Sequence, residues 1–311
     1  MADGGTRTRI RGLTIPTGAE AVHGILLIIA AYIVITGADV AVKWALPEVG
    51  VGLAMVSRGV VGTLAVAIIV RGRGLFPNNR RLLASRSLLH CSVSAVWYWA
   101  WERSMPLADS YAIACAAPLL MTVLAIPMLG EKVGWRRWTS TLVGCAGVLF
   151  MLQPAGDLWR VETPFLLVAV VIMAITRIWM RVLSATDGPA AIAFWLLAAH
   201  IPVGLLLMAT VAPPPAAIPS YGVIAALIAF GIANAVAHLL FSRAFALAPV
   251  STLAPFEYTP LLWGAVLGFL IWVEVPAWTT LGGAAIVIVA GLYNLHRERV
   301  RRAMEAGQAA R

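Results

Sequence analysis

Long apolar runs separated by short polar stretches dominate the pattern of the chain. Each run has about twenty residues, which lets a helix cross the hydrocarbon core of a bilayer. Prolines cluster in the stretches between the runs, where helices end. The pattern predicts an all-α membrane protein with ten transmembrane helices, at 22–44, 51–70, 84–102, 107–129, 138–153, 163–183, 190–212, 221–241, 250–272 and 277–296.

The composition supports this class. Apolar residues make up 61% of the 311 residues and charged residues 12%, with a mean hydropathy of +0.88. A soluble domain of this length needs more charge on its surface. The formal net charge of +9 points away from nucleic acid, because the arginines lie in short loops between apolar runs and no soluble basic domain is present.

Motifs for common enzyme chemistry are missing from the sequence. It contains no GxxxxGK[ST] loop, no HExxH and no GxSxG elbow, so we expect no enzyme activity, no catalytic residues, no cofactor and no metal. Cys91, Cys115 and Cys145 lie inside apolar runs without CxxC spacing, and they are expected to be buried free thiols.

Lysine and arginine are distributed unequally between alternate loops, which predicts the orientation. We expect both termini in the cytoplasm, as a tail at 1–21 and a basic tail at 297–311. The opposite side carries little beyond Lys43, Arg103 and Arg160. The cytoplasmic side would hold Arg7, Arg9, Arg11, Arg71, Arg73, Arg80, Arg81, Arg86, Lys132, Arg136, Arg137, Arg181, Arg243, Arg297, Arg299, Arg301 and Arg302.

A unit of two helices occurs twice in the chain. Each copy has an apolar helix with a proline, a turn with a glutamate and a second apolar helix; the markers are Pro118 and Glu131, then Pro260 and Glu274. Because each half contains five helices, an odd number, the second copy must enter the membrane from the opposite side. We therefore predict an inverted repeat of 22–153 and 163–296. The two glutamates are expected to stabilise the helix ends that follow them.

Five short motifs resemble the drug/metabolite transporter superfamily, in its ten-helix form built from two EamA domains. They are Ser57-Arg58-Gly59, Ala117-Pro118-Leu119-Leu120, Leu129-Gly130-Glu131, Tyr258-Thr259-Pro260-Leu261 and Val273-Glu274, with valine where the family usually has glycine. The resemblance covers about 22–296. It implies a secondary transporter of the bacterial inner membrane that exports amino acids, particularly aromatic ones, or other small metabolites.

Charged residues inside the spans need partners or a water-filled cavity. Depth along the helices predicts that Asp39 pairs with Arg58 in the outer half, and that Lys43, one turn beyond Asp39, shares its carboxylate. A fixed neutral cluster that holds two helices together explains this group as well as a coupling role does. In the inner half Arg177 and Glu257 are expected to pair. These two could bind the carboxylate and the amine of a substrate, or neutralise each other.

Two polar and aromatic stripes occupy equivalent positions in the halves. Ser94, Tyr98 and Trp101 share one helical face, and 140 residues later Asn234 and His238 occupy the corresponding face. Such a mixture suits a small-molecule pocket, although aromatic stripes in membrane helices also serve packing. His238 has a side chain that can titrate near neutral pH and couple transport to protons.

Together these features favour a transporter that exports a small zwitterionic metabolite, an aromatic or hydrophobic amino acid above others, by alternating access. The partners are the substrate and the lipid bilayer. A transporter of the same fold for another solute, such as a drug, nucleoside or sugar phosphate, is an open alternative. An intramembrane enzyme and a scaffold are further alternatives. Monomer and homodimer are equally compatible with the sequence.

Overall fold

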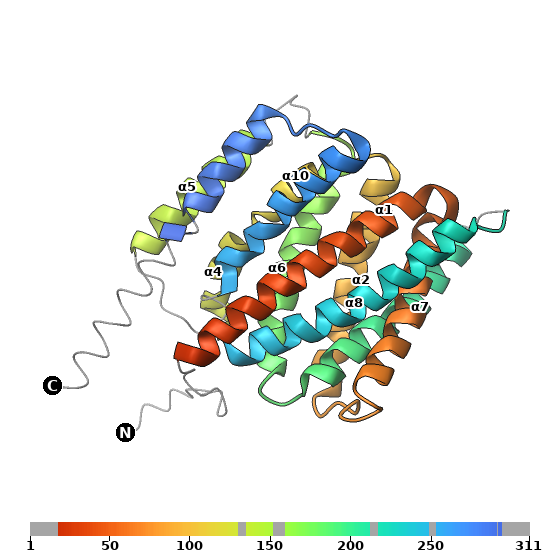
Figure 1. Cartoon of the computed structure of the whole chain (residues 1–311). Coiled ribbons are helices and arrows are strands. Elements are labelled where there is room, and N and C mark those ends of the chain that lie inside the picture. The colour runs from red at the N-terminus through yellow and green to blue at the C-terminus, as the bar shows by residue number, and fades with distance from the viewer. Residues whose placement is uncertain are drawn as a thin grey trace, which may run out of the picture.

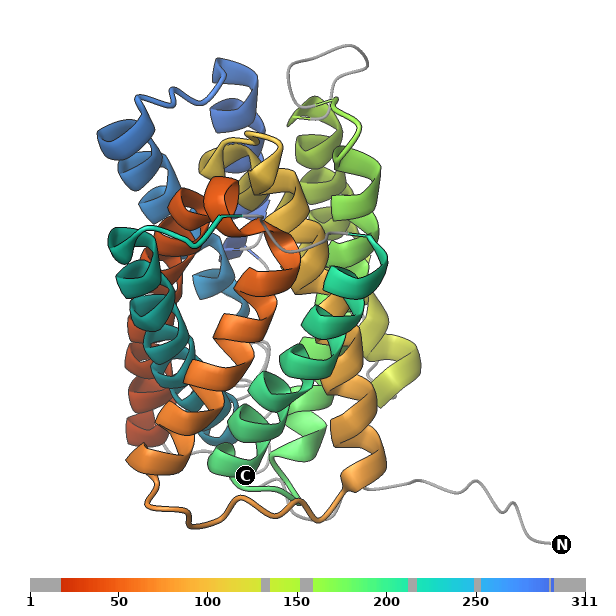
Figure 2. The same cartoon turned by 90° about the vertical axis from the view of Figure 1, so that its right-hand side faces the viewer.

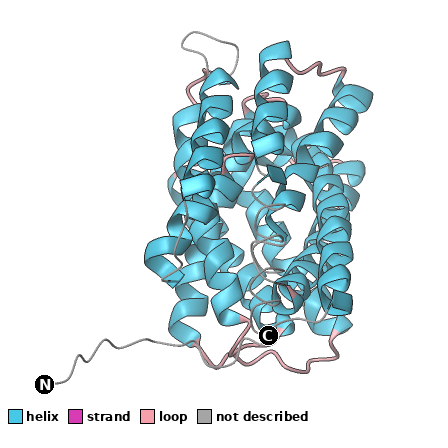
Figure 3. Cartoon of the chain, turned by 90° about the vertical axis from the view of Figure 1, so that its left-hand side faces the viewer, coloured by secondary structure: helices cyan, strands magenta, loops and turns pink. Residues whose placement is uncertain are grey.

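The computed structural model describes residues 18–129, 135–151, 159–211, 217–248, 253–290 and 292–293. Every regular element in these ranges is a helix (Figure 3). Four helices, Val22–Ile69, Thr163–Leu183, Pro189–Thr210 and Tyr221–Leu247, are long and apolar enough to cross a membrane. The prediction of an α-helical membrane protein therefore agrees with the structure. Gly130, Glu131, the basic tail 297–311 and residues 1–17 of the predicted N-terminal tail lie outside the described residues, whereas 18–21 belong to the first helix.

The helix α1 (Gly18–Ile69) consists of two arms that meet at Gly50, where the backbone has φ 67° and ψ 170°. Only glycine adopts this conformation without strain. The chain turns back there, so that the two arms run in opposite directions (Figure 1). The first helix therefore extends beyond the predicted range 22–44, because the first arm continues through Pro47 and ends at the glycine.

The two arms of α1 pack against α8 (Tyr221–Leu247) and α7 (Pro189–Thr210) (Figures 1 and 2). Glycines on the second arm allow its backbone to approach α7 closely. A Cβ at Gly52 would lie 3.1 Å from the backbone nitrogen of Met208, and one at Gly59 would lie 2.9 Å from that of Ile201. The second arm and α7 are therefore antiparallel neighbours.

A second antiparallel pair forms between α2 (Arg80–Glu102) and α6 (Thr163–Leu183). The rings of Trp99 and Phe165 lie 5.3 Å apart near one end. Near the other end Arg86 Nε donates to the carbonyl oxygen of Thr176 at 3.2 Å. Arg86 is 1% exposed, so this arginine, counted on the cytoplasmic side in the prediction, lies buried between the helices.

The predicted helices 107–129 and 250–272 are each interrupted near a proline. The first comprises α3 (Leu107–Ala114) and α4 (Ala117–Leu129), and the second comprises the 3₁₀-helix η1 (Ala254–Tyr258) and α10 (Thr259–Trp272). A proline ring clashes with the carbonyl four residues earlier. For Pro118 that carbonyl belongs to Ala114, where α3 ends.

The remaining described helices, α5 (Trp135–Met151) and Trp278–Ala290, lie side by side (Figure 1). A Cβ at Gly147 would lie 3.0 Å from the carbonyl oxygen of Gly283, and the rings of Phe150 and Trp278 are 5.8 Å apart. Cys145 on α5 is exposed, contrary to the expectation of a buried thiol, whereas Cys91 and Cys115 are buried.

Gly204 on α7 provides a test of this close packing. A Cβ there would lie 2.8 Å from the carbonyl oxygen of Gly52 and 2.9 Å from the nitrogen of Val56, and neither backbone atom can move independently. We expect Gly204→Val to lower the free energy of unfolding by about 1–3 kcal/mol through overpacking, measured by thermal unfolding in detergent.

Gly37→Ala is the matched control, because nothing lies within 4 Å of a Cβ at that helical position. It should leave stability unchanged or raise it by up to about 1 kcal/mol through helix propensity. Equal melting temperatures for the two variants would contradict the close contact between α1 and α7.

Candidate functional site

A cavity of about 120 Å³ lies between the helices and contains most of the predicted site residues. Its walls come from both arms of α1 and from α2, α3, α6, α8, η1 and α10. The predicted residues that line it are Asp39, Arg58, Ser94, Tyr98, Trp101, Arg177, His238 and Glu257. Its lining therefore combines buried charges of both signs with aromatic rings, which is the composition of a small-molecule pocket.

Arg58 connects three helices at one side of the cavity. Its Nη1 donates to Ser94 Oγ at 2.8 Å and to Tyr98 Oη at 2.6 Å, and its Nη2 lies 2.8 Å from His238 Nε2. A guanidinium only donates hydrogen bonds, so His238 Nε2 must be the acceptor and this imidazole is neutral, with its proton on Nδ1. The side chain of Arg58 is thereby held in place while its Nε keeps a free donor.

The predicted pairing of Asp39 with Arg58 is wrong in detail. Both residues line the cavity, but among the described side chains Asp39 Oδ2 accepts a 2.6 Å hydrogen bond from Tyr111 Oη, and the donors of Arg58 are directed to α2 and α8 instead. Tyr111 was not predicted, because a tyrosine in an apolar run resembles ordinary packing.

Lys43 also has a different partner from the one predicted. It forms an ion pair with Glu274 rather than sharing the carboxylate of Asp39. One helical turn separates Asp39 from Lys43, and that turn brings Lys43 level with the loop after α10. The sequence pattern shows this turn, but it cannot show which loop folds over it.

The predicted pairing of Arg177 and Glu257 is confirmed, with Arg177 Nε 3.5 Å from Glu257 Oε1. Neither of these buried atoms has a hydrogen-bond partner among the described residues. Arg177 Nη2 donates to Tyr32 Oη at 3.3 Å, and its guanidinium lies over the ring of Phe241, 4.5 Å from the centroid. The pair is thus fixed in position, with its two facing atoms within ion-pair distance of each other but without a hydrogen bond to any described residue.

The two predicted stripes differ in their relation to the cavity. Ser94, Tyr98 and Trp101 all line it from α2, and His238 lines it from α8. Asn234 is not among these lining residues; it is fully buried, and its Nδ2 donates to the carbonyl oxygen of Phe230 at 2.9 Å. A carbonyl one turn earlier in the same helix holds this amide against its own backbone.

Three histidines surround Ser94, two more than the predicted site included. His200 Nε2 lies 3.0 Å from Ser94 Oγ, and its Nδ1 lies 2.8 Å from the carbonyl oxygen of Leu196. The ring of His90 is 5.7 Å from that of His238 and also lines the cavity. In sequence these histidines are far apart, so only the packing of α2, α7 and α8 reveals the cluster.

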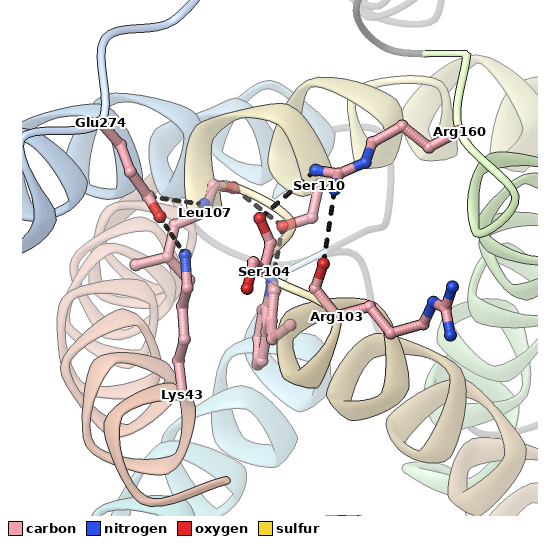
Figure 4. A network of polar contacts seen from close by, with 8 residues as sticks. Lys43, Arg103, Ser104, Leu107, Ser110, Arg160 and Glu274 are labelled. Atoms are coloured by element: carbon pink, nitrogen blue, oxygen red, sulfur yellow. Dashed lines mark hydrogen bonds and ion pairs between the residues drawn. The ribbon is translucent and has the colours of Figure 1, made fainter. Parts of the chain in front are cut away.

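A separate polar network lies at the end of the bundle where α1 turns at Gly50, which we call the Gly50 end (Figure 4). Glu274 binds Lys43 there and accepts a 3.2 Å hydrogen bond from the backbone nitrogen of Leu107 at the start of α3. Glu274 therefore caps a helix of the other half rather than the helix that follows it, which corrects the prediction. Arg103 pairs with Glu162 across α2 and α6.

Comparison with known proteins gives relatives that are transporters. No protein-family model matches the chain. The riboflavin transporter of Vibrio cholerae is 29% identical over 63% of this chain and 64% of its own length. The S-adenosylmethionine uptake transporter of Rickettsia bellii is 26% identical over 65% of this chain and 68% of its own length. The matched part thus spans slightly less than two thirds of the first relative.

A longer match joins the chain to the pseudopaline exporter CntI of Pseudomonas aeruginosa, which is 25% identical over 86% of this chain and 94% of the relative. A solved structure described as "Crystal structure of protein" shares the fold, with a TM-score of 0.66 over 90% of this chain and 14% identity. These relatives are named as transporters of riboflavin and of S-adenosylmethionine and as an exporter of pseudopaline.

The Arg177 and Glu257 pair makes a prediction for stability. Removing one partner of a buried pair leaves an uncompensated charge, which costs about 3–5 kcal/mol. We expect Glu257→Gln and Arg177→Gln to lower the melting temperature strongly, and the double variant to recover much of that loss. Thermal unfolding of the purified single and double variants measures the coupling.

Arg103→Gln is the control, because the side chain of Arg103 is 52% exposed and Arg160 Nε still lies 3.9 Å from the carboxylate of Glu162, so the loss of stability should be smaller. Additive losses in the Arg177 and Glu257 double variant would contradict a direct interaction between the two side chains.

Proposed function

We propose that this protein is a secondary transporter that moves a small zwitterionic metabolite across the bacterial inner membrane by alternating access. The observation that carries the proposal is the cavity, in which a buried guanidinium and a buried carboxylate face each other as an ion pair whose two facing atoms form no hydrogen bond among the described residues. Intramembrane charges of this kind mark substrate or ion pathways. The transporter relatives support the same class.

The chemistry of the lining favours an amino acid with an aromatic or hydrophobic side chain. Arg177 would bind the substrate carboxylate and Glu257 its ammonium group, so that the ligand inserts between the two partners. The stacked rings of Tyr98 and Trp101, 5.9 Å apart, offer an apolar surface to the side chain. The direction we propose is export, as in the family that the sequence motifs resemble.

A second candidate is a larger aromatic metabolite. Two relatives are named as transporters of riboflavin and of S-adenosylmethionine, and both molecules combine a flat ring system with polar groups. The 120 Å³ cavity favours the smaller amino acid. A direct comparison of these substrates distinguishes the candidates.

Helix contacts support the inverted repeat that alternating access requires. In a 5+5 arrangement the first arm of α1 corresponds to α6, α2 to α8, and α3 with α4 to η1 with α10. The packing of α1 against α8 would then correspond to the packing of α6 against α2. The packing of α1 against α10 would correspond to that of α6 against α4. All four pairs of helices are in contact. The repeats 22–153 and 163–296 are thus the units that we expect to move.

The network at the Gly50 end would act as the gate on the outer side. Both of its ion pairs, Lys43 with Glu274 and Arg103 with Glu162, join residues of different halves. Opening this end would separate them. The opposite end carries the exposed arginines Arg71, Arg73, Arg80 and Arg81, which the positive-inside rule assigns to the cytoplasm together with both termini.

His238 gives this mechanism a route for coupling to protons. Protonation of its Nε2 would remove the acceptor that Arg58 uses and would place two cations in contact, so the Arg58 contact and a protonated His238 exclude each other. The other charged or titratable groups near His238 are Arg86, Arg177, His90 and His200. All of these are bases, whereas the carboxylates of Asp39 and Glu257, which line the same cavity, bind Tyr111 and Arg177.

Transport in proteoliposomes tests the substrate. We expect labelled tryptophan or phenylalanine to enter protein-containing vesicles at least tenfold faster than empty ones, and riboflavin or S-adenosylmethionine to compete weakly. Glu257→Gln should lower uptake by tenfold or more, because it removes the ammonium ligand. Glu48→Gln, at the turn between the arms of α1, is the control that should transport normally.

If no amino acid crosses faster than in empty vesicles while riboflavin does, the second candidate replaces the first. Failure of every solute would refute the transporter proposal for this chain.

The pH dependence of uptake tests His238. We expect the wild-type uptake rate to change severalfold between about pH 5.5 and about pH 8. His238→Gln should give a flat pH profile, because an amide accepts the Arg58 hydrogen bond without titrating near neutral pH. His23→Gln, an exposed histidine near the start of α1, should keep the wild-type profile. An unchanged profile in His238→Gln would exclude this residue from coupling.

A further inference from the structure

A second hollow lies on the outside of the bundle, between α2 and α7, and has a volume of about 590 Å³. Ala84 and Ser87 form its floor on α2, and Ala198 and Ala199 form it on α7. The two residues on α2 are three positions apart and share one helical face, and the two on α7 are adjacent in the sequence. Small side chains on both faces leave a groove along the helices, and its lining shares no residue with that of the central cavity.

The rim of this groove is held in place by hydrogen bonds. Trp195, which is 42% exposed, donates from Nε1 to the carbonyl oxygen of Leu75 at 2.8 Å. The backbone nitrogen of Asn78 donates to Asp187 Oδ1 at 2.6 Å. Between these two anchors Phe76 is 86% exposed and lines the groove. The shape is therefore built by the fold, and its apolar rim is fixed against the groove.

Charge at one end of the groove defines what can occupy it. Arg80 lines the groove at the first turn of α2 and is exposed, and the exposed Arg71, Arg73 and Arg81 lie at the same end. The nearby carboxylate of Asp187 is 5% exposed and accepts hydrogen bonds from the backbone of the loop. An apolar groove with a free guanidinium at its end complements an apolar chain with an anionic head.

We propose that this groove binds an anionic phospholipid, with one acyl chain between α2 and α7 and the phosphate at Arg80. A guanidinium binds phosphate oxygens in a bidentate manner, and basic pockets between membrane helices on the cytoplasmic side bind anionic head groups. From Arg80 to Leu88 the groove follows α2 for about 12 Å, so the chain runs into the membrane while its head stays at the level of Arg80. A second copy of the protein is a poorer occupant, because a symmetric contact here would bring these arginines together.

Trp195 serves as an internal probe in the test. The protein is reconstituted in phosphatidylcholine bilayers of two kinds. One contains a small fraction of brominated phosphatidylglycerol, and the other contains the same fraction of brominated phosphatidylcholine. The bromine atoms quench tryptophan fluorescence on contact. The contribution of Trp195 is obtained by subtracting the signal of Trp195→Phe. We expect brominated phosphatidylglycerol to quench this contribution at least threefold more strongly than brominated phosphatidylcholine.

Two variants separate the head group from the chain. Arg80→Gln should abolish the preference for phosphatidylglycerol, whereas Arg73→Gln, an exposed arginine outside the groove lining, should retain it. Ala198→Phe should fill the groove and reduce quenching by both lipids. The proposal would be overturned by equal quenching by the two lipids in the wild type, or by a lipid preference that survives in Arg80→Gln. It would also be overturned if neither lipid quenched Trp195, because another protein surface would then cover the groove.

Discussion

Charge buried in an apolar bundle is the constraint on which the rest of the structure depends. Arg58, Arg86 and Arg177 are all less than 9% exposed, and in a low-dielectric interior each of them needs acceptors or an opposite charge. Residues of other helices meet this need: Ser94, Tyr98 and His238 for Arg58, the backbone of α6 for Arg86, and Glu257 for Arg177. The same contacts that satisfy the arginines therefore fix how α1, α2, α6 and α8 surround the cavity.

Backbone irregularities shape this cavity as much as side chains do. Gly50 folds α1 back on itself, so both Asp39 and Arg58 reach the cavity from one helical hairpin. Prolines interrupt the helices that contribute Tyr111 and Glu257. In a membrane, non-helical backbone is tolerated only where protein buries it or where it lines a cavity. The broken helices and the ion pair of Arg177 and Glu257, whose facing atoms form no hydrogen bond among the described residues, thus belong to the same site.

The two ends of the bundle differ in the way they are closed. At the Gly50 end, side chains far apart in the sequence meet directly in the ion pairs of Lys43 with Glu274 and Arg103 with Glu162. At the other end, exposed arginines project from the loop before α2, and the groove between α2 and α7 opens beside them. The proposed movement of two halves would separate the ion pairs at the first end and keep the arginines of the second end at the membrane surface.

The sequence by itself determined the helical membrane class and which polar residues were too costly to bury without a reason, because apolar runs of about twenty residues have few other solutions. It predicted Arg177 with Glu257, since both lie at equal depth in their helices and carry opposite charge. Only the tertiary structure decided that Lys43 binds Glu274, that Tyr111 holds Asp39, and that Asn234 bonds to its own helix. Periodicity gives the depth and the face of a residue along one helix, whereas the choice of partner depends on helix rotation and on loops, which are set by packing among all the helices at once.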